Sequence, residues 1–272
     1  MHAGLLAGNA QAQTYTIKLG GAYIDPRATS GDLEGTITTG FSPAPVVPLS
    51  EGNRLEVRPQ STLVFSIERA IGDHWGVELF LGIPPTHDVK LRASEIVKAG
   101  AARAALVKAS LGSDAFTNPA KASAAITAVG GTANYLSLRV ADNVNHYDGT
   151  TVARVKQTAP TLFLNYKLLA VSSALRPYLG VGLNYTSFKI SATQAGVDLY
   201  TDGPVRISST DSIGLAFQAG VNYKLDKNWL LSAAWATAAV KNEFTIRTNS
   251  TEQNASYRFH PSVFTLTAGY QF

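Results

Sequence analysis

Two residues near the C-terminus have side chains and a spacing that could support acyl hydrolysis. His260 and Ser262 are separated by one residue, and in a strand this spacing puts both side chains on one face. A histidine can serve as general base for a serine nucleophile when a third group orients its ring, and Glu243 or Glu252 could supply that group. Pro261 lies inside the pair, however, and a match of this length arises readily by chance. The pattern permits a hydrolase without predicting one.

Other patterns that could hold a ligand are weaker. The segment Asp142–His146 offers oxygen ligands for a hard cation, but it lacks the ligand number and the glycine of a calcium loop. Gly180-Val181-Gly182 lies inside a strand pattern rather than at a strand-to-helix turn, so it is not a phosphate loop. The chain has no cysteine, which excludes disulfides and thiolate metal sites. We therefore expect no catalytic residue, no metal site and no cofactor.

The elements that carry these residues are expected to be strands, and the final segment 262–272 shows the pattern best. Apolar side chains alternate there with small or polar ones, so that one face carries Phe264, Leu266, Ala268, Tyr270 and Phe272. Strand side chains have a period of two, which lets one face meet an apolar phase while the other stays wet. The aromatic last residue is typical of the closing strand of an outer-membrane β-barrel, where aromatic girdles mark the membrane interfaces.

Eight segments are expected to be strands, and the connections between them alternate between short and long. The short turns fall near positions 72, 172 and 227, whereas the segments 26–60, 93–150, 193–211 and 249–256 are longer. Short periplasmic turns and long external loops are typical of outer-membrane barrels, and a β-sandwich would not show this regular alternation. We predict an all-β, eight-stranded antiparallel transmembrane barrel with strands at about 15–25, 61–71, 75–92, 152–169, 175–192, 212–225, 229–248 and 262–272.

One long connection has a different composition. Residues 94–111 are rich in good helix formers, and 120–129 could form a second short helix. As an external loop, 93–150 would either cap the barrel mouth or be a poorly ordered decoration. The sequence contains no run of roughly 18 apolar residues that would span a bilayer as a helix.

The net charge and the N-terminal sequence indicate which partners and which domain boundaries to expect. The net charge is +4, from 23 basic and 19 acidic residues spread along the chain, so no nucleic-acid partner is expected. The N-terminal run of Ala, Gly and Leu before Ala10-Gln11-Ala12 resembles the end of a secretory signal whose basic start is missing. We expect residues 1–12 to be a signal-peptide remnant and 13–272 to be a single barrel domain.

Alternation also assigns the faces of the predicted strands. The fully apolar faces are expected to meet lipid, and the opposite faces would line a lumen that includes Val64, Phe80, Phe163 and Tyr178. A barrel of eight strands is wide enough only to be filled by side chains or to hold one small ligand. Buried charges need partners, so the charged residues near the periplasmic strand ends are expected to form a salt-bridged plug. These residues are Lys18, Glu68, Glu78, Lys167 and Lys224.

Several of these strands resemble the OmpW/AlkL family of outer-membrane proteins. The resemblance rests on the segments 176–186, 76–79 with Pro84 and His87, 160–162, 214–221, and Pro261 with 268–272. The matches cover every strand except the first and recur in the family's order. The family implies an eight-stranded barrel that admits small hydrophobic molecules, with an apolar channel leading to a lateral opening in the wall.

The resemblance also implies roles for individual residues. Pro84 occupies the position of a family proline beside the lateral opening, and Pro85 could widen the gap because proline donates no hydrogen bond to the ladder; a simple strand end is the alternative reading of both. The resemblance places His87 at the same lateral opening. Phe80 matches an apolar residue at the channel floor, but the second floor residue falls at Ala236, where the family has a bulky side chain. The long 93–150 segment is a second departure from the family.

Three hypotheses about function follow. The first is a passive outer-membrane channel for small hydrophobic molecules such as alkanes and aromatics, which cross by lateral diffusion through the wall. The second is a structural or adhesive barrel that acts through its loops. The third is a lipid A-modifying hydrolase built on His260 and Ser262. The expected partners are outer-membrane lipid and lipopolysaccharide, small hydrophobic solutes, and the barrel assembly machinery through Phe272.

Overall fold

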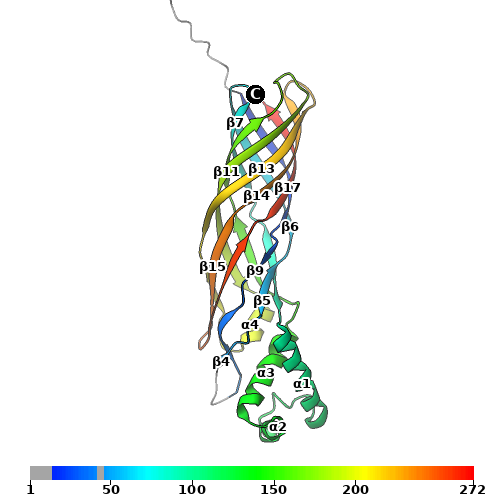
Figure 1. Cartoon of the computed structure of the whole chain (residues 1–272), viewed down its shortest axis with the longest axis vertical. Helices are drawn as coiled ribbons and strands as arrows, with labels where there is room; N and C mark the ends of the chain where they lie inside the picture. Colours follow the sequence, from blue (N-terminus) through cyan, green and yellow to red (C-terminus); the bar gives the residue numbers. More distant parts are fainter. Residues whose placement is uncertain (1–13, 42–45) are drawn as a thin grey trace, which may run out of the picture.

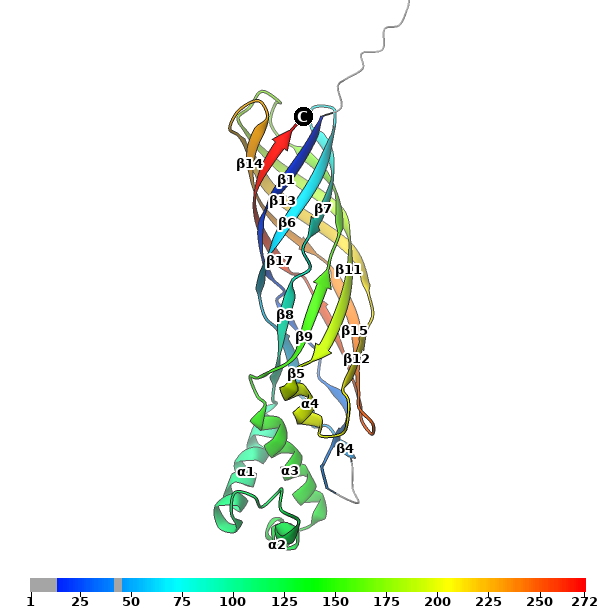
Figure 2. The same ribbon diagram turned by 180° about the vertical axis from the view of Figure 1, so that it is seen from behind.

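The computed structural model describes residues 14–41 and 46–272. The expected signal-peptide remnant, residues 1–12, lies outside the described residues. The molecule is elongated, with strands running along its length and most of its helices gathered at one end (Figures 1 and 2). None of the helices in the described ranges is both long and apolar enough to cross a membrane.

Eight antiparallel strands close into a barrel, as the sequence predicted. Around the barrel β10 is followed by β7, β6, β1, β17, β14, β13 and β11, and pairing of β11 with β10 closes the circle. The strands are β1 (Tyr15–Asp25), β6 (Gln60–Ile71), β7 (Trp75–Gly82), β10 (Thr161–Lys167), β11 (Leu175–Ala192), β13 (Ser212–Lys224), β14 (Trp229–Ala238) and β17 (Ser262–Gln271).

The alternating sequence pattern explains which side chains face outward. Along β13, Ile213, Leu215 and Phe217 are exposed, whereas Ala216 and Gln218, at alternate positions, are buried in the lumen. The other barrel strands repeat the pattern, so that the outer wall is covered by large apolar side chains. Leaving such a surface in water would be costly, and a surrounding apolar phase removes the cost.

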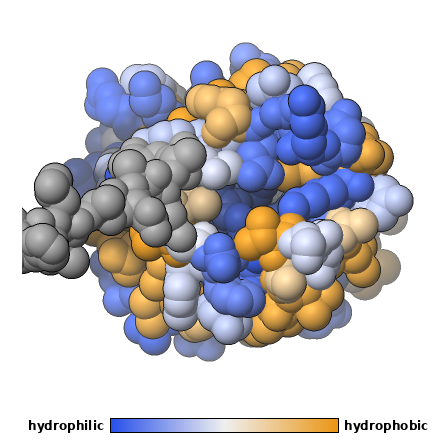
Figure 3. All heavy atoms as spheres, turned by 90° about the horizontal axis from the view of Figure 1, so that it is seen from above, coloured by the Kyte–Doolittle hydropathy of each residue, from blue (hydrophilic) through white to orange (hydrophobic). Residues whose placement is uncertain are grey.

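The two ends of the barrel differ. At one end, here named the turn end, short turns join β6 to β7, β10 to β11 and β13 to β14, and Tyr15 N–H donates to the carbonyl of Phe272 over 2.9 Å. Figure 3 shows this end from above, with a group of hydrophilic residues at the middle and both hydrophobic and hydrophilic residues around the edge. The opposite end, the cap end, carries the long connections and the helices (Figure 1).

The barrel wall continues towards the cap end as a second tier of strands that the sequence analysis did not separate. The expected strands 75–92, 152–169 and 229–248 are each divided in two, and the expected loops 26–60, 193–211 and 249–256 contain strands. The tier consists of β2 (Ala28–Thr29), β3 (Glu34–Thr38), β4 (Val46–Pro48), β5 (Arg54–Val57), β8 (Thr86–Arg92), β9 (Thr151–Thr158), β12 (Arg206–Ser209), β15 (Val240–Arg247) and β16 (Glu252–Phe259).

The long 93–150 connection folds into a helical cap. It contains α1 (Glu95–Leu111), η1 (Pro119–Lys121), α2 (Ala122–Val129) and α3 (Thr132–His146), and the first two α-helices agree with the expected ranges. Ser94 caps α1 by accepting from Val97 N–H, and Gly130 ends α2 in the left-handed conformation at φ 81°. The cap has its own core around Phe116 and Tyr135. It is therefore an ordered unit and not a loose decoration.

The cap is attached to the second tier through α3. Arg139 donates from its guanidinium to the carbonyls of Thr39 and Gly40, and Asn143 Nδ2 donates to the carbonyl of Leu199 over 2.8 Å. Leu199 belongs to a further short helix, α4 (Gln194–Tyr200), which packs against β9. Helices α3 and α4 thus lie together across the cap end of the barrel (Figure 2).

Candidate functional site

A cavity inside the barrel contains four of the five residues that the sequence analysis placed in the lumen. Val64, Phe80, Phe163 and Ala236 line it, from strands β6, β7, β10 and β14. We name it the lower cavity because it lies nearer the turn end, although Figure 1 draws that end at the top. It measures about 90 Å³, several times the roughly 10–15 Å³ that one water requires. The fifth residue, Tyr178, lies outside the lining.

The barrel wall is interrupted beside the lower cavity. The ladder between β7 and β10 ends at the Phe80–Thr161 pair, and the ladder between β8 and β9 begins at the Thr86–Lys156 pair. Between these ladders, two segments face each other without pairing with one another, 81–84 and 158–160. We name this interruption of the wall the seam. Pro84, Pro85 and Pro160 supply no N–H there, which explains why the ladder cannot continue.

Two residues of the seam line the lower cavity and are also exposed. Gly82 and Ile83 line the lower cavity, and both are exposed, Ile83 to 55%. The remaining described residues of that lining are buried or half-buried. Gly82 and Ile83 of the seam are thus the two residues of this lining that are exposed.

The residues expected at a lateral opening are distributed around this seam. Pro84 and Pro85 lie within or directly beside it, and Pro85 also lines the lower cavity. His87 lies one step further along β8, fully buried, with Nδ1 2.8 Å from the carbonyl of Arg58. It therefore belongs to the wall of the second tier rather than to the break itself.

A cluster of charged side chains fills the lumen between the lower cavity and the turn end. Lys18 Nζ lies 3.0 Å from Glu68 Oε2 and 3.0 Å from Glu78 Oε1, and Lys167 Nζ lies 2.6 Å from Glu68 Oε1. The Lys18 ammonium also lies 5.4 Å from the centre of the Tyr178 ring. We call these four charged residues the plug.

Neutral neighbours complete the coordination of the plug. Glu78 accepts hydrogen bonds from Ser66 Oγ at 2.6 Å, Asn165 Nδ2 at 2.8 Å and Gln218 Nε2 at 3.0 Å. Gly76 makes room for the Glu68 carboxylate, because a Cβ at Gly76 would overlap it. Every charge is paired, which is the condition for keeping charges in the interior.

Lys224, which was expected in the plug, is not part of it. Its Nζ donates to the backbone carbonyl of Val171 in the turn that joins β10 and β11. Lys224 ends β13 at the rim of the barrel, so its side chain reaches the nearest turn and not the Glu68 or Glu78 carboxylates.

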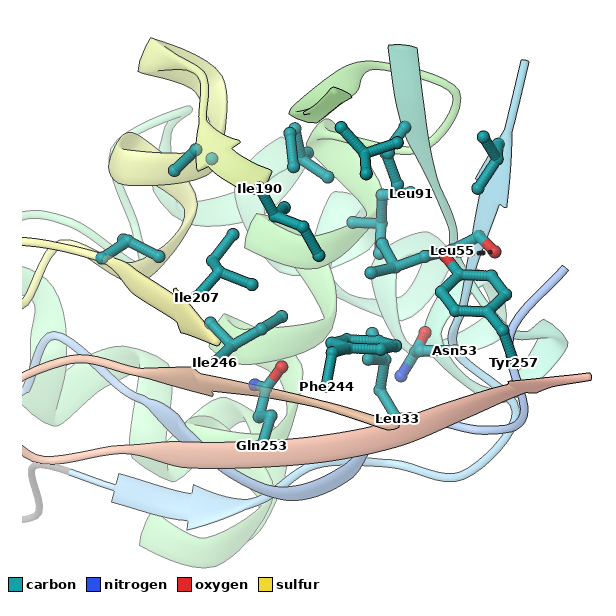
Figure 4. Close-up of a pocket in the computed structure, with 18 of the residues that line it drawn as sticks. Leu33, Asn53, Leu55, Leu91, Ile190, Ile207, Phe244, Ile246, Gln253 and Tyr257 are labelled. Carbon is teal, nitrogen blue, oxygen red and sulfur yellow. Dashed lines mark hydrogen bonds between the residues drawn. The ribbon is translucent and has the colours of Figure 1, made fainter. Parts of the chain in front are cut away.

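A second cavity, named the upper cavity, lies within the second tier, nearer the cap end. The sequence analysis did not predict it. It measures about 70 Å³ and is lined almost entirely by apolar side chains from the second tier and from α3 and α4. Figure 4 shows Leu33, Leu55, Leu91, Ile190, Ile207, Phe244 and Ile246 around it. No single segment signals this upper cavity, because its wall combines short strands that are far apart in the sequence.

Most polar groups in the upper cavity are bonded within the wall. Tyr200 Oη donates to Gln253 Oε1 over 2.6 Å, and Tyr257 Oη donates to the carbonyl of Leu55 over 3.2 Å. Asn53 donates to the Ser50 carbonyl and accepts from Ser94 N–H. Burial raises the pKa of Tyr200 and of Tyr257, so both phenols stay neutral. The cavity therefore presents a mostly apolar, uncharged surface.

The two cavities are stacked along the barrel. On β9, Val155 lines the upper cavity and Gln157 lines both cavities, and Ala159, which directly follows β9, lines the lower one. On β15, Asn242 lines the upper cavity and Val240 the lower one. Successive inward positions thus pass from one cavity to the other, and both cavities lie on the cap side of the plug.

The hydrolase pattern is not assembled. Ser262 is buried and its Oγ accepts from Trp235 Nε1 over 3.2 Å, whereas His260 is exposed. Glu252 pairs with Arg247 at 2.9 Å, and Glu243 is exposed on the outer face. Because Pro261 interrupts the strand between β16 and β17, the side chains of His260 and Ser262 do not share a face.

Comparison with known proteins identifies the architecture. The model of the OmpW family matches residues 107–272, which is more than half of the chain. The chain belongs to the OmpW family. The match includes five of the eight barrel strands, from β10 to β17, together with β9, β12, β15 and β16 of the second tier.

Curated relatives agree with this assignment over part of their length. The chain is 32% identical over 127 residues to outer membrane protein W of Vibrio cholerae serotype O1, covering 44% of this chain and 55% of that protein. It is 31% identical over 126 residues to outer membrane protein W of Escherichia coli strain K12, covering 44% and 56%. The matched region therefore spans about half the length of these relatives.

Solved structures share the fold of this OmpW family member. The crystal structure of the outer membrane protein OprG from Pseudomonas aeruginosa aligns with a TM-score of 0.66 at 21% identity and covers 96% of each chain. The solid-state NMR structure of the outer membrane protein AlkL in lipid bilayers aligns with a TM-score of 0.53 at 18% identity, covering 100% of this chain and 97% of that one. The protein is an outer-membrane β-barrel, and its apolar outer wall lies in the lipid of that membrane.

Proposed function

We propose that this barrel admits small hydrophobic molecules, such as alkanes and simple aromatics, passively across the outer membrane. The solute would occupy the apolar upper cavity, pass to the lower cavity and leave sideways through the seam into the membrane. Removing an apolar solute from water is favourable by about 0.8 kcal/mol per buried methylene, so the process needs neither cofactor nor energy source. The proposal rests on the seam residues Gly82 and Ile83, which line the lower cavity and are exposed at the break in the wall.

The plug supports a lateral rather than an axial exit. An apolar solute that continued along the barrel axis would have to separate Lys18 from Glu68 and Glu78, whose contacts are 3.0 Å long. Separating buried charges costs far more than displacing the apolar side chains beside the seam. The seam also opens at the level of the outward-facing apolar residues, so the solute would pass from one apolar phase to another.

Restoring a hydrogen-bond donor in the seam is expected to slow uptake. Ile83 directs both its N–H and its C=O towards β6, where they meet Leu63 and Thr62, so position 84 lies on the side of the strand that faces the seam. Pro84→Ala would supply the missing N–H there. One added wall hydrogen bond contributes about 1 kcal/mol, and we expect uptake to fall about fivefold.

The measurement is the initial rate of uptake of radiolabelled n-octane and toluene into cells with and without the protein. Pro119→Ala, in the helical cap far from the seam, is the matched control and should behave like the wild type. If the protein accelerates neither solute, the proposed function is wrong, and a structural or adhesive role becomes the better account.

Assembly is a further part of the proposal. Phe272 is exposed at the turn end, and its ring stacks on Tyr15 with centroids 6.1 Å apart. Its backbone joins β17 to β1, so this residue completes the closure of the barrel. We propose that the barrel assembly machinery recognises this aromatic end, and that lipopolysaccharide surrounds the outer part of the wall.

A further inference from the structure

The upper cavity contains two polar side chains that the protein leaves without partners. Six of the side chains in its lining can form hydrogen bonds, and Asn53, Tyr200, Gln253 and Tyr257 each bond within the wall. Asn242 and Gln157 form no side-chain hydrogen bond with any described residue. We call Asn242 and Gln157 the junction amides, because both lie where the upper cavity meets the lower one.

Asn242 provides the stronger observation. Its side chain is 4% exposed and its Oδ1 is buried without a hydrogen-bond partner, while the residue lines the upper cavity. Its inward neighbours on β15 are Val240 and Phe244, neither of which has a polar side chain. An unsatisfied buried amide costs free energy that a leucine of similar size would not cost. A group inside the cavity that bonds to the amide would remove this cost.

Gln157 is placed beside the seam. It lines both cavities, and its backbone N–H donates to the carbonyl of Pro85 over 3.0 Å. The backbone is thereby fixed against the edge of the seam, while the side-chain amide remains free. A solute that moves from the upper cavity to the seam would pass both junction amides.

We propose that the junction amides bind the polar group of an uncharged amphipathic solute, with an alkyl or aromatic body and one hydroxyl or carbonyl group. This inference rests on the proposed function and specifies its substrate class. A carboxamide offers both N–H donors and a C=O acceptor, so it can pair with either group. Neither cavity lining contains a charged side chain, so a carboxylate or an ammonium would lose its hydration without a compensating partner. The apolar remainder of the solute would fill the surrounding aliphatic wall.

The test compares initial rates of protein-dependent uptake for 1-octanol and n-octane, which have the same chain length and differ by one hydroxyl. We expect the wild type to favour octanol. Asn242→Leu combined with Gln157→Leu should lower the octanol-to-octane ratio about fivefold and leave octane uptake unchanged or faster. A fivefold change corresponds to about 1 kcal/mol, the net value of one neutral hydrogen bond.

Two controls separate binding from folding. Asn254→Leu makes the same chemical change on the outer face of the adjoining strand β16 and should not alter the ratio. Asn242→Leu removes a buried unpaired amide, so its resistance to unfolding in detergent should equal or exceed that of the wild type.

The outcomes distinguish this inference from the function on which it rests. A lower ratio in the double variant, with octane uptake intact, supports the role of the junction amides. An unchanged ratio with protein-dependent uptake of both solutes overturns that role and leaves the channel function standing; the amides would then bind water only. Absence of protein-dependent uptake for both solutes overturns both proposals.

Discussion

Replacing Lys18 with methionine is expected to lower the free energy of unfolding by about 3–5 kcal/mol, the cost of leaving buried charges unpaired. Lys18 bridges Glu68 and Glu78 at 3.0 Å each, and all three side chains are almost fully buried. Without the ammonium, the two carboxylates would repel each other and only Glu68 would keep a cationic partner, Lys167. The change should appear as a lower urea midpoint for unfolding of the detergent-solubilised barrel.

Two variants test the cause of this loss. Lys227→Met removes a lysine from an exposed turn and should leave the midpoint unchanged, since isolated exposed charges contribute little. Lys18→Met combined with Glu68→Gln and Glu78→Gln removes all three charges and should recover much of the lost stability, because replacing a whole buried ion cluster costs less than breaking it. A Lys18→Met barrel as stable as the wild type would show that the plug does not stabilise the fold.

Filling the lower cavity should block uptake more strongly than any change at its edge. Ala236 lines this cavity from β14 together with Phe80, and a phenylalanine side chain at position 236 would occupy much of its about 90 Å³. We expect Ala236→Phe to reduce protein-dependent uptake of n-octane and toluene by at least about tenfold, while the barrel still folds because the added ring enters existing space. Initial rates of radiolabelled uptake into cells measure the effect.

The same strand offers the control. Ala233 is exposed on the outer face of β14, so Ala233→Phe adds the same ring towards lipid and should leave uptake unchanged. Equal amounts of the folded variants in the outer membrane are required for the comparison. Unimpaired uptake by Ala236→Phe would show that the lower cavity is not on the solute path.

The barrel could be predicted from the sequence because its strands obey a local rule. Side chains along a strand alternate between the two faces, and this alternation assigned Val64, Phe80 and Phe163 to the lumen. All three line the cavity inside the barrel. The acidic residues Glu68 and Glu78 fell on lumen-facing positions, and buried carboxylates require cationic partners, which the structure supplies through Lys18 and Lys167. Local alternation and charge pairing thus explain why these four residues lie together in the lumen.

The second tier depends on information that single segments do not carry. The seam divides the expected strand 75–92, and only the pairing of β8 with β9 reveals that residues 86–92 belong to another ladder. Segment 249–256 was expected to be one of the longer connections between strands, yet β16 begins at Glu252 and pairs with β15 along its whole length. Long-range pairing decides these strands, and local propensity does not.

Helix α3 and the junction amides were missed for different reasons. No side chain caps the start of α3 at Gly131, so the sequence lacks the usual signal of a helix N-terminus. Asn242 lies on a strand of mixed polarity, and its lack of a partner becomes visible only when the neighbouring side chains are placed. Satisfaction of a polar group is a property of its three-dimensional surroundings.

The most direct test of the lateral route is to close the seam reversibly and measure uptake. Gly82 and Ala159 line the lower cavity from opposite sides of the seam, and the chain contains no cysteine. In a Gly82→Cys and Ala159→Cys variant, a short bifunctional thiol reagent with a reducible disulfide would link the two segments, and each single-cysteine variant treated alike is the control. We predict that uptake of n-octane stops when the seam is linked and returns on reduction. Uptake that continues unchanged through a fully linked seam would contradict the lateral route.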